Sequence, residues 1–392
     1  MISVSEALDA LFALVAPLPS ETVSLHDAAG RVMAEDAVAR RPQPPFAASA
    51  MDGYAIQGDA VPGTQFEVIG EAAAGHEYKG KVATGQAVRI FTGAPVPDGA
   101  TRVIIQEDVT RKGNIITVSE GVDEKTYIRP AGGDFQVGQR INAPRRLGPS
   151  DLALLASMNY SELQVSRQPT VALIATGDEL VMPGETPSAD QIIASNTFGL
   201  KAMFEQAGAL VRMIPIAKDR ESALSQALFL AADNDLIITI GGASVGDHDL
   251  VGKVAQDKGL ERAFYKVAMR PGKPLMAGRI GGAALVGLPG NPVSSMVCGE
   301  IFILPMLRKM LGLPAEPRPR LRCTLMKALG PNGPREHYMR ARYDLTYRQV
   351  QAFQNQDSSL LTVLAEANAL IVRPPNDPAK EVDEDVDVIP LG

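Results

Sequence analysis

The spacing of apolar residues changes repeatedly along this chain, and each change predicts a different kind of structure. Residues 4–16 carry apolar side chains at helical intervals, with Ser3 or Ser5 available as the cap, and helical spacing returns at residues 150–159. Between them, residues 42–140 are rich in proline and glycine and contain short alternating runs, which are typical of a small β domain. We therefore predict a β domain inserted into a helical one. Its strands are expected at residues 66–69, 87–91, 102–106 and 115–118.

A different pattern follows from about residue 169 to residue 313, where strand-like and helix-like segments alternate. This alternation predicts a doubly wound, mostly parallel sheet with helices on both faces. The expected strands are 171–175, 210–216, 236–240 and 283–288, and the expected helices are 195–207 and 221–233.

A proline cluster at residues 314–319 marks the next boundary, after which the pattern becomes short-stranded again. Strands are expected at residues 320–325, 338–343 and 369–373. The predicted organisation is a multidomain α/β protein. It comprises a discontinuous helical domain (1–41 and 141–168), an inserted β domain (42–140), an α/β domain (169–315) and a C-terminal β domain (316–392).

Composition supports a globular protein of several domains, because 392 residues exceed one ordinary core and 45% of them are hydrophobic. No apolar run approaches the length of a membrane span, and the first residues do not resemble a secretory signal. Cys298 and Cys323 form neither a disulfide framework nor a zinc spacing. We expect a soluble, cytoplasmic protein that inserts into no membrane.

Two glycine-rich loops follow two of the predicted strands. Strand 236–240 leads into Gly241-Gly-Ala-Ser-Val-Gly-Asp-His-Asp249, and strand 283–288 leads into Pro289-Gly-Asn-Pro292. Loops at the carboxyl ends of parallel strands leave backbone N–H groups free to bind anions. The segment 266–273, between the loops, carries three cations in a chain of formal net charge −7, namely Lys266, Arg270 and Lys273. This combination predicts a small, multiply charged ligand, because a nucleic acid would require an extended basic face.

Several common sites are absent from the sequence. The segment Arg270-Pro-Gly-Lys273 lacks the glycine loop and the Ser/Thr of a Walker A motif, and glycines 241, 242 and 246 have the wrong spacing for a dinucleotide fingerprint. The four histidines lie too far apart in sequence to suggest a transition-metal centre held by the protein. Ordinary surface charge remains the alternative explanation for any single lysine or arginine.

Motifs along most of the chain resemble those of the MoeA-type molybdopterin molybdenumtransferases, whose relatives include the E domain of gephyrin. The matching segments occur in the family's order. They are residues 49–55 (SAMDGYA), 89–97 (RIFTGAPVP), 129–134 (RPAGGD), 176–180 (TGDEL), 241–246 (GGASVG), 270–274 (RPGKP) and 288–293 (LPGNPV). Arg270 stands where the family usually has lysine, which keeps the charge but presents a planar fork.

The resemblance implies a MoaB/Mog-like α/β domain and a small β-barrel-like C-terminal domain. It also implies an activity, the insertion of molybdate into adenylated molybdopterin with release of AMP in the presence of Mg²⁺. The working unit would be a homodimer whose active site is shared between chains. Molybdopterin adenylyltransferase and the recipient molybdoenzymes or their chaperones would be partners.

Candidate site residues follow from matching these motifs position by position. Molybdate and a phosphoanhydride require cations and backbone donors, and carboxylates beside such anions are expected to hold Mg²⁺. The expected catalytic residues are Asp52, Thr92, Glu179, Asp219, Asp249, Lys266 and Arg270. The expected cofactor-binding residues are Gly241, Gly242, Ser244, Gly246, Lys273, Pro289, Gly290, Asn291, Pro292, Ser294, Arg340 and Ser358, with Arg335 as a further contributor. The expected metal ligands are Asp52, Asp134, Glu179 and Asp247.

Structural roles compete with some of these assignments. Asp52 could cap a turn, Thr92 before a glycine is often structural, and Asp178 is expected to cap a helix. Two other functions remain open. A molybdopterin adenylyltransferase would use a similar glycine loop, but such proteins are near one α/β domain in length. A scaffold or cofactor carrier would resemble gephyrin, although the chain shows no long linker or second fused domain.

Overall fold

The first helix of the protein belongs to the core of the α/β domain. The computed structural model describes residues 1–242 and 250–391. Helix α1 (Val4–Leu14) is closed by a capping box, in which the Glu6 backbone N–H donates to Ser3 Oγ at 3.2 Å and the Ser3 N–H donates to Glu6 Oε2 at 2.7 Å. Its apolar stripe, including Leu8 and Leu11, is buried against the α/β domain.

This packing differs from the expected grouping of residues 1–41 with residues 141–168. The stripe of α1 needs a broad apolar surface, and strands β20 (Glu261–Tyr265) and β22 (Met276–Ile280) supply it.

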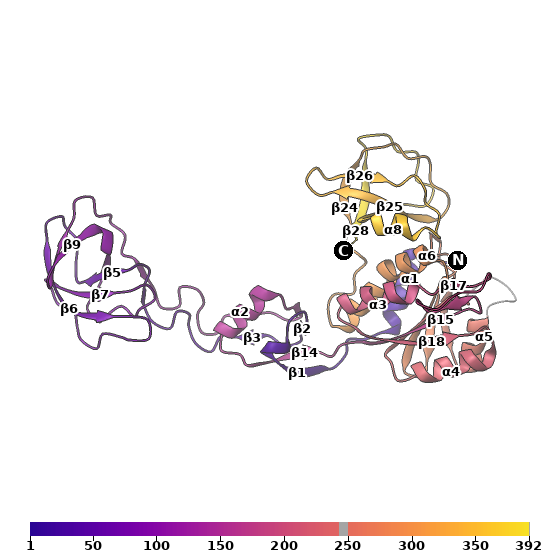
Figure 1. Cartoon of the computed structure of the whole chain (residues 1–392), viewed down its shortest axis with the longest axis horizontal. Coiled ribbons are helices and arrows are strands. Elements are labelled where there is room, and N and C mark those ends of the chain that lie inside the picture. Colours follow the sequence, from indigo (N-terminus) through magenta and orange to yellow (C-terminus); the bar gives the residue numbers. More distant parts are fainter. Residues whose placement is uncertain (243–249, 392) are drawn as a thin grey trace.

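The chain then forms a small unit of one sheet and one helix. Strands β1 (Ser20–Ser24), β14 (Glu162–Ser166), β2 (Val32–Met33) and β13 (Arg145–Arg146) form a four-stranded sheet in that order. Helix α2 (Pro149–Ser157) packs over it around Leu155, which confirms the helical segment expected at residues 150–159. The antiparallel pair β3 (Ala37–Val38) and β12 (Arg140–Ile141) connects this unit to the inserted β domain. The segments that enter and leave the inserted domain therefore lie side by side (Figure 1).

The inserted β domain lies beyond this unit, at the end of the molecule opposite the α/β domain (Figure 1). Its six-stranded sheet has the order β8-β5-β7-β6-β10-β9. The strand bounds are β5 (Gly53–Ile56), β6 (Gln65–Ala72), β7 (Gln86–Ile90), β8 (Arg102–Ile105), β9 (Val109–Lys112) and β10 (Ile115–Val118). Adjacent residues such as Ala55 and Ile56 enter different cores, so both faces of the sheet are covered. A short pair, β4 (Ala48–Ser49) with β11 (Ile128–Arg129), closes the domain.

The α/β domain has the expected mostly parallel sheet, with the order β18-β15-β19-β23-β22-β20. Strands β15 (Thr170–Thr176), β18 (Leu210–Ala217), β19 (Leu236–Ile240) and β23 (Ala283–Leu288) are parallel, and β22 and β20, the last two strands of the order, pair antiparallel. Helices lie on both faces. They are α3 (Asn196–Gln206), α4 (Glu221–Ala231), α5 (Leu250–Asp257), α6 (Pro292–Cys298), the π-turn η3 (Gly299–Ile303) and α7 (Leu304–Met310).

The C-terminal domain is a closed barrel of five strands. These are β24 (Leu321–Leu325), β25 (Glu336–Asp344), β26 (Gln349–Ala352), β27 (Ala369–Arg373) and β28 (Asp385–Pro390), and the barrel closes because β25 pairs with both β26 and β27. Helix α8 (Leu361–Glu366) covers the side towards α6. Strand β21 (Met269–Arg270) of the α/β domain adds to β25 in parallel.

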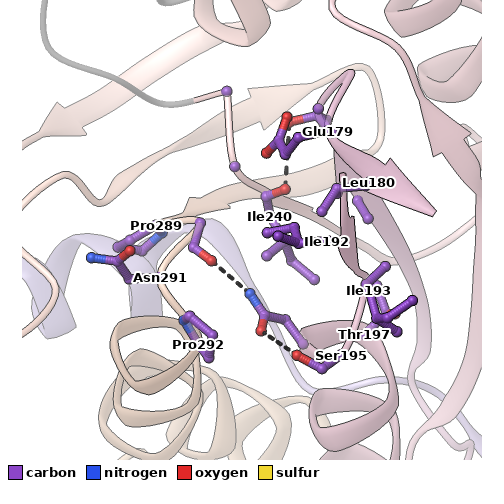
Figure 2. A pocket seen from close by; sticks show the side chains of 18 of the residues that line it. Glu179, Leu180, Ile192, Ile193, Ser195, Thr197, Ile240, Pro289, Asn291 and Pro292 are labelled. Atoms are coloured by element: carbon purple, nitrogen blue, oxygen red, sulfur yellow. Dashed lines mark hydrogen bonds between the residues drawn. The ribbon is translucent and has the colours of Figure 1, made fainter. Parts of the chain in front are cut away.

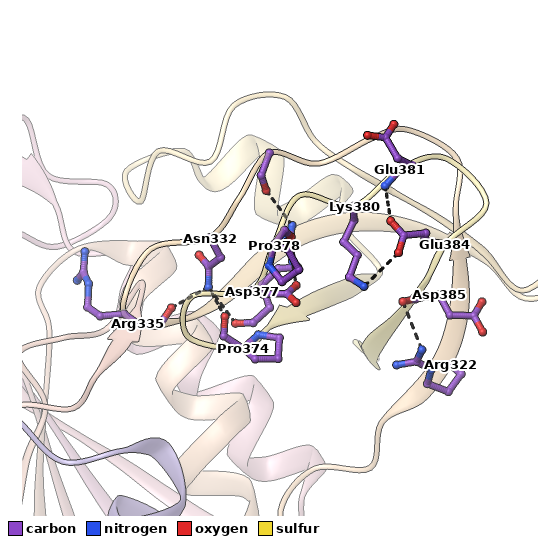
Figure 3. A network of polar contacts seen from close by, with 12 residues as sticks. Arg322, Asn332, Arg335, Pro374, Asp377, Pro378, Lys380, Glu381, Glu384 and Asp385 are labelled. Atoms are coloured by element: carbon purple, nitrogen blue, oxygen red, sulfur yellow. Dashed lines mark hydrogen bonds and ion pairs between the residues drawn. The ribbon is translucent and has the colours of Figure 1, made fainter.

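A polar network fixes the barrel loops nearest to β21 (Figure 3). Asn332 Nδ2 donates to the carbonyl oxygens of Arg335 at 2.9 Å and Pro374 at 2.6 Å. Buried Arg373 forms an ion pair with Asp377. These contacts provide hydrogen-bond donors for the carbonyl groups of loops that have no regular secondary structure. They thereby hold Arg335 in place beside β21. None of the helices in the described part of the chain is long and apolar enough to span a membrane.

Candidate functional site

A cavity of about 620 Å³ opens at the carboxyl edge of the parallel sheet. Loops after β15, β19 and β23 form its floor, where doubly wound sheets place their ligands. A two-stranded ribbon, β16 (Leu180–Val181) with β17 (Ile192–Ile193), forms one wall (Figure 2). The expected site residues that line the cavity are Glu179, Asp219, Gly241, Gly242, Pro289, Gly290, Asn291 and Pro292.

Glycines allow the floor loops to approach one another as bare backbone. Gly242 has φ +64°, and a Cβ there would lie 2.4 Å from Val251 Cγ2 and 2.8 Å from Thr176 Oγ1. A Cβ on Gly290 would lie 3.5 Å from the Cα of Gly241, so the two loops are in contact. Side chains at Gly241 and Gly242 would therefore strain the backbone and crowd the floor of the cavity.

Asn196, at the start of α3, ties the ribbon side of the cavity to the second glycine loop. Its Nδ2 donates to the Gly290 carbonyl at 2.7 Å, and its Oδ1 accepts from Ser195 Oγ at 3.3 Å (Figure 2). Sequence reasoning missed both residues, together with Thr176 and the isoleucines of β17. The signal was present, because a polar Ser-Asn-Thr run begins the expected helix at the carboxyl edge of the sheet.

The barrel contributes the rim of the cavity through residues 356–360. Asn291 Nδ2 donates to Ser358 Oγ at 3.0 Å, and the Val293 N–H donates to the Ser358 carbonyl at 3.1 Å. Ser359, which sequence reasoning missed, lines the cavity. Arg340 is fully buried and donates to the Leu360 carbonyl at 3.2 Å, so it supports this loop from beneath.

Three carboxylates lie together at the ends of β15 and β18. The Asp219 N–H donates to Asp178 Oδ1 at 3.2 Å. Asp178 therefore caps no helix, contrary to expectation, because the chain turns at once into strand β16. Partial burial, and then the charges of Asp178 and Glu179, raise the pKa of Asp219. Such like-charge crowding attracts a cation.

The donor set of this cluster suits Mg²⁺, which prefers oxygen ligands and commonly uses one or two carboxylates plus substrate phosphates and waters. Within residues 1–242 and 250–391 no group of three or more Asp, Glu, His or Cys side chains is arranged to hold a metal ion. A metal here would accordingly need oxygen ligands from water or substrate in addition to Glu179 and Asp219.

The expected cations do not line the cavity, although Lys273 directly precedes Pro274, which does. Lys266 has φ +69° and its Nζ lies 4.8 Å from the centroid of the Tyr265 ring. Arg270 is exposed on β21, opposite His337, and Lys273 is exposed one residue before Pro274 of the cavity wall.

A group of arginines surrounds His337. Burial, followed by the charges of Arg270, Arg373, Arg335 and Arg340, lowers the pKa of His337 to about 4. The imidazole is therefore neutral at pH 7 and does not add to this positive charge. Arg335 Nη1 donates to the Met269 carbonyl at 3.3 Å, which connects the barrel to β21.

Asp52 and Thr92 form a pair in the inserted β domain, away from the cavity of the same chain (Figure 1). The Thr92 N–H and Oγ1 donate to Asp52 Oδ1 at 2.7 and 2.8 Å, and these two bonds hold the pKa of Asp52 below its usual value. Asp134 is exposed in the same domain. Ser294 is buried in the first turn of α6 rather than in the cavity. The expected residues Ser244, Gly246, Asp247 and Asp249 lie outside the described residues.

Comparison with known proteins identifies the class of each part of the chain. Residues 2–159 match the MoeA N-terminal region (domain I and II), residues 172–309 match the probable molybdopterin binding domain, and residues 322–391 match the MoeA C-terminal region (domain IV).

Full-length relatives support the same assignment. The molybdopterin molybdenumtransferase of Haemophilus influenzae is 34% identical over 91% of this chain and 90% of its own. Molybdopterin molybdenumtransferase 2 of Mycobacterium tuberculosis is 36% identical over 89% and 90%. The crystal structure of the molybdopterin biosynthesis MoeA protein from Pyrococcus horikoshii OT3 has a TM-score of 0.84 and 26% identity, covering 100% of both chains. The chain belongs to the MoeA family of molybdopterin molybdenumtransferases.

Proposed function

We propose that this protein inserts molybdate into adenylated molybdopterin and releases AMP, as a step of molybdenum cofactor biosynthesis. The observation that carries this proposal is the match of all three MoeA regions, in order, together with a cavity whose floor includes two glycine loops. The same match weighs against a molybdopterin adenylyltransferase, which needs only the α/β domain. It also weighs against a scaffold, because the full-length relatives that share these regions are named molybdopterin molybdenumtransferases.

The residues of the cavity suit an anionic, multiply charged ligand. Backbone N–H groups at Gly242 and Gly290 would bind the phosphate oxygens, because the loops bring bare backbone to the floor, whereas the Gly241 N–H already donates to the Leu288 carbonyl at 3.1 Å. Asn291 and Ser358 would hold the pterin end from the rim. Lys266 and Arg270 would attract molybdate towards the cavity, with Arg270 able to bind two oxygens at once.

Mg²⁺ would be held by Glu179 and Asp219, and its charge would neutralise the phosphate oxygens of the leaving AMP. Glu179 would be positioned by the close turn at Gly177, where a Cβ would lie 2.5 Å from Glu179 Oε2. Asp247 and Asp249, from the glycine-rich loop, are further candidates for this role, as the resemblance implies.

The distance between the inserted β domain and the cavity leads to a proposal about assembly. The Asp52–Thr92 pair and Asp134 would complete the cavity of a partner protomer, in a two-fold homodimer. Molybdopterin adenylyltransferase would supply the substrate, and recipient molybdoenzymes or their chaperones would accept the product. These reactions would take place in the cytoplasm.

A defined assay tests the activity. Purified protein is mixed with adenylated molybdopterin, molybdate and Mg²⁺, and both AMP release and molybdenum retained with the pterin are measured. AMP and molybdenum-loaded pterin should appear in equal amounts. Consumption of ATP with unadenylated molybdopterin, and no reaction with molybdate, would instead identify an adenylyltransferase.

A further inference from the structure

One arginine of the linker contacts both the α/β domain and the barrel. Arg318 Nε forms an ion pair at 3.1 Å with Oε2 of Glu300, in the π-turn η3, although the contact lacks the geometry of a hydrogen bond. Its Nη2 donates to the Pro390 carbonyl at 3.3 Å, on β28. A single guanidinium thus bridges two domains whose relative angle decides the shape of the cavity rim.

The linker presents this side chain rigidly. Pro317 and Pro319 flank Arg318, so the linker has φ fixed on both sides. The residue before a proline is also restricted to extended backbone. The backbone of Arg318 therefore loses little conformational freedom when the residue bridges Glu300 and Pro390, while its side chain still becomes ordered.

The Glu300 end of the bridge is held as firmly. Its side chain is buried, and η3 is a π-helical turn, a rare geometry that often marks a functional position. A Cβ on Gly299 would lie 2.9 Å from Leu200 Cδ2 and 2.9 Å from Met203 Sδ, which shows how closely the turn packs on α3. Removing Arg318 would leave a buried carboxylate without its compensating charge.

Apolar packing joins the two domains, since Tyr338, Leu370 and Val372 of the barrel belong to the core of the α/β domain, but this packing is incomplete beside Glu300. A cavity of about 170 Å³ lies beside Glu300, between α6 and α8. Its other walls are Met203, Met296, Val297, Leu364, Ala367, Leu370 and Leu391. Side chains that line a void lack the contacts that would otherwise resist movement of one domain against the other. The Glu300–Arg318 pair therefore contributes more of this resistance.

Both walls of this void lead directly to the catalytic cavity. Helix α8 begins at Leu361, directly after Ser358 and Ser359, and α6 begins at Pro292, directly after Asn291. Any change in the angle between α6 and α8 would move Ser358 relative to Asn291. The contact between them, at 3.0 Å, tolerates little displacement.

We propose that Glu300 and Arg318 are positioning residues that set the angle of the barrel on the α/β domain and thereby hold Ser358 against Asn291. Only the catalytic consequence of this inference rests on the proposed function. None of the contacts described for the pair involves Gly241, Gly242 or residues 289–292, and its effect is transmitted through α6, α8 and the linker.

The distance between two spin labels, one in each domain, tests the positioning role of the Glu300–Arg318 pair and requires no measurement of enzyme activity. Labels at Phe229→Cys on α4 and Tyr347→Cys in the barrel use exposed positions, while the native cysteines are buried. Arg318→Met and Glu300→Gln should each broaden the distance distribution. The double variant should be no broader than Arg318→Met alone, because the two side chains act as one unit. Arg318→Lys should be intermediate, since it keeps the charge but loses the fork.

Arg322→Met is the matched control. Arg322 forms an ion pair with Asp387 at 3.1 Å, and both residues belong to the barrel domain. The loss of this pair should therefore leave the distance distribution unchanged. An unaltered distribution in both Arg318→Met and Glu300→Gln would overturn the proposal. Should Arg318→Met fail to fold, Glu300→Gln and Arg318→Lys still decide the matter.

Kinetics then test the consequence for the site. The KM for adenylated molybdopterin should rise several-fold in Arg318→Met, with a smaller change in kcat, because the rim and not the reacting groups is displaced. Broadened distances with an unchanged KM would overturn this positioning role. If the parent protein transfers no molybdenum, the proposed function fails. The distance measurements still decide whether the Glu300–Arg318 pair fixes the angle between the domains.

Discussion

The side-chain amide of Asn291 donates to Ser358 Oγ at 3.0 Å, joining a loop of the α/β domain to a loop of the barrel, 67 residues further along the chain. Neither residue belongs to a long element, so their contact depends on how the two domains meet. Ser358 is not free to serve a ligand independently, because its carbonyl also accepts from the Val293 N–H at 3.1 Å. The rim of the cavity is thus built by two domains together.

Asn291→Ala should loosen the rim with little loss of stability, because one partly exposed hydrogen bond contributes only about 1 kcal/mol. We expect the affinity for adenylated molybdopterin, measured by titration calorimetry, to fall while the thermal midpoint stays near that of the parent. Asn142→Ala, a change at an exposed asparagine between β12 and β13, serves as the control. Equal affinity in both variants would remove Asn291 from the binding surface.

Arg270→Ala should weaken molybdate binding and leave the fold intact, since an exposed charge adds little to stability. Lys258→Ala removes a cation that is likewise exposed but lies on another part of the α/β domain, and it should bind molybdate as the parent does. Equilibrium dialysis with labelled molybdate distinguishes the two. Unchanged molybdate affinity in Arg270→Ala would show that Arg270 is surface charge only.

Asp219→Asn should have opposite effects on stability and activity. Its folded-state pKa is raised, by burial first and then by Asp178 and Glu179, so ionised Asp219 destabilises the fold as pH rises through that pKa. Removing the charge should therefore raise the urea midpoint slightly at pH 7. The same change should raise the Mg²⁺ concentration needed for half-maximal activity. A lowered midpoint together with an unchanged Mg²⁺ requirement would contradict both parts.

Asp235 should make stability sensitive to acid. Burial raises its pKa, but bonds from Arg167 (2.7 and 2.9 Å) and Thr170 (2.8 Å) outweigh burial and hold the pKa below its usual value. Its contribution is present above the unfolded-state pKa and is lost as pH falls through the folded-state pKa. Asp235→Asn should cost about 1–3 kcal/mol at pH 7. The difference between variant and parent should shrink below about pH 4, as followed by urea unfolding. A difference that is constant with pH would exclude this linkage.

Mixing two inactive variants tests the shared site. Asp52→Asn and Lys266→Ala proteins should each lack activity, and subunit exchange should restore part of it. About half of randomly exchanged dimers are heterodimers, and each of these has one cavity without either mutation. Asp59→Asn, at an exposed aspartate of the same β domain, should remain active alone. No recovery after demonstrated exchange would place the whole site within one chain.

Regular elements were predictable because local spacing determines them. The strands 66–69, 171–175, 236–240 and 283–288 all lie within observed strands, since each run buries its side chains on the faces its pattern requires. The two glycine loops were equally visible, because strain at φ above zero and close approach both require glycine. Helix α1 was recognised as a helix, but its partner was not.

The position of α1, the contribution of Asn196 and the contact of Ser358 with Asn291 were decided by tertiary structure alone. An amphipathic stripe specifies that a helix must be covered, but not by which surface, because burial of apolar area is non-directional. A polar side chain in a loop likewise has no preferred partner until the domains meet. The sequence by itself therefore determined the elements, the positions of the glycine-rich loops and the family. Only the packing of domains decided which of the candidate residues share one cavity.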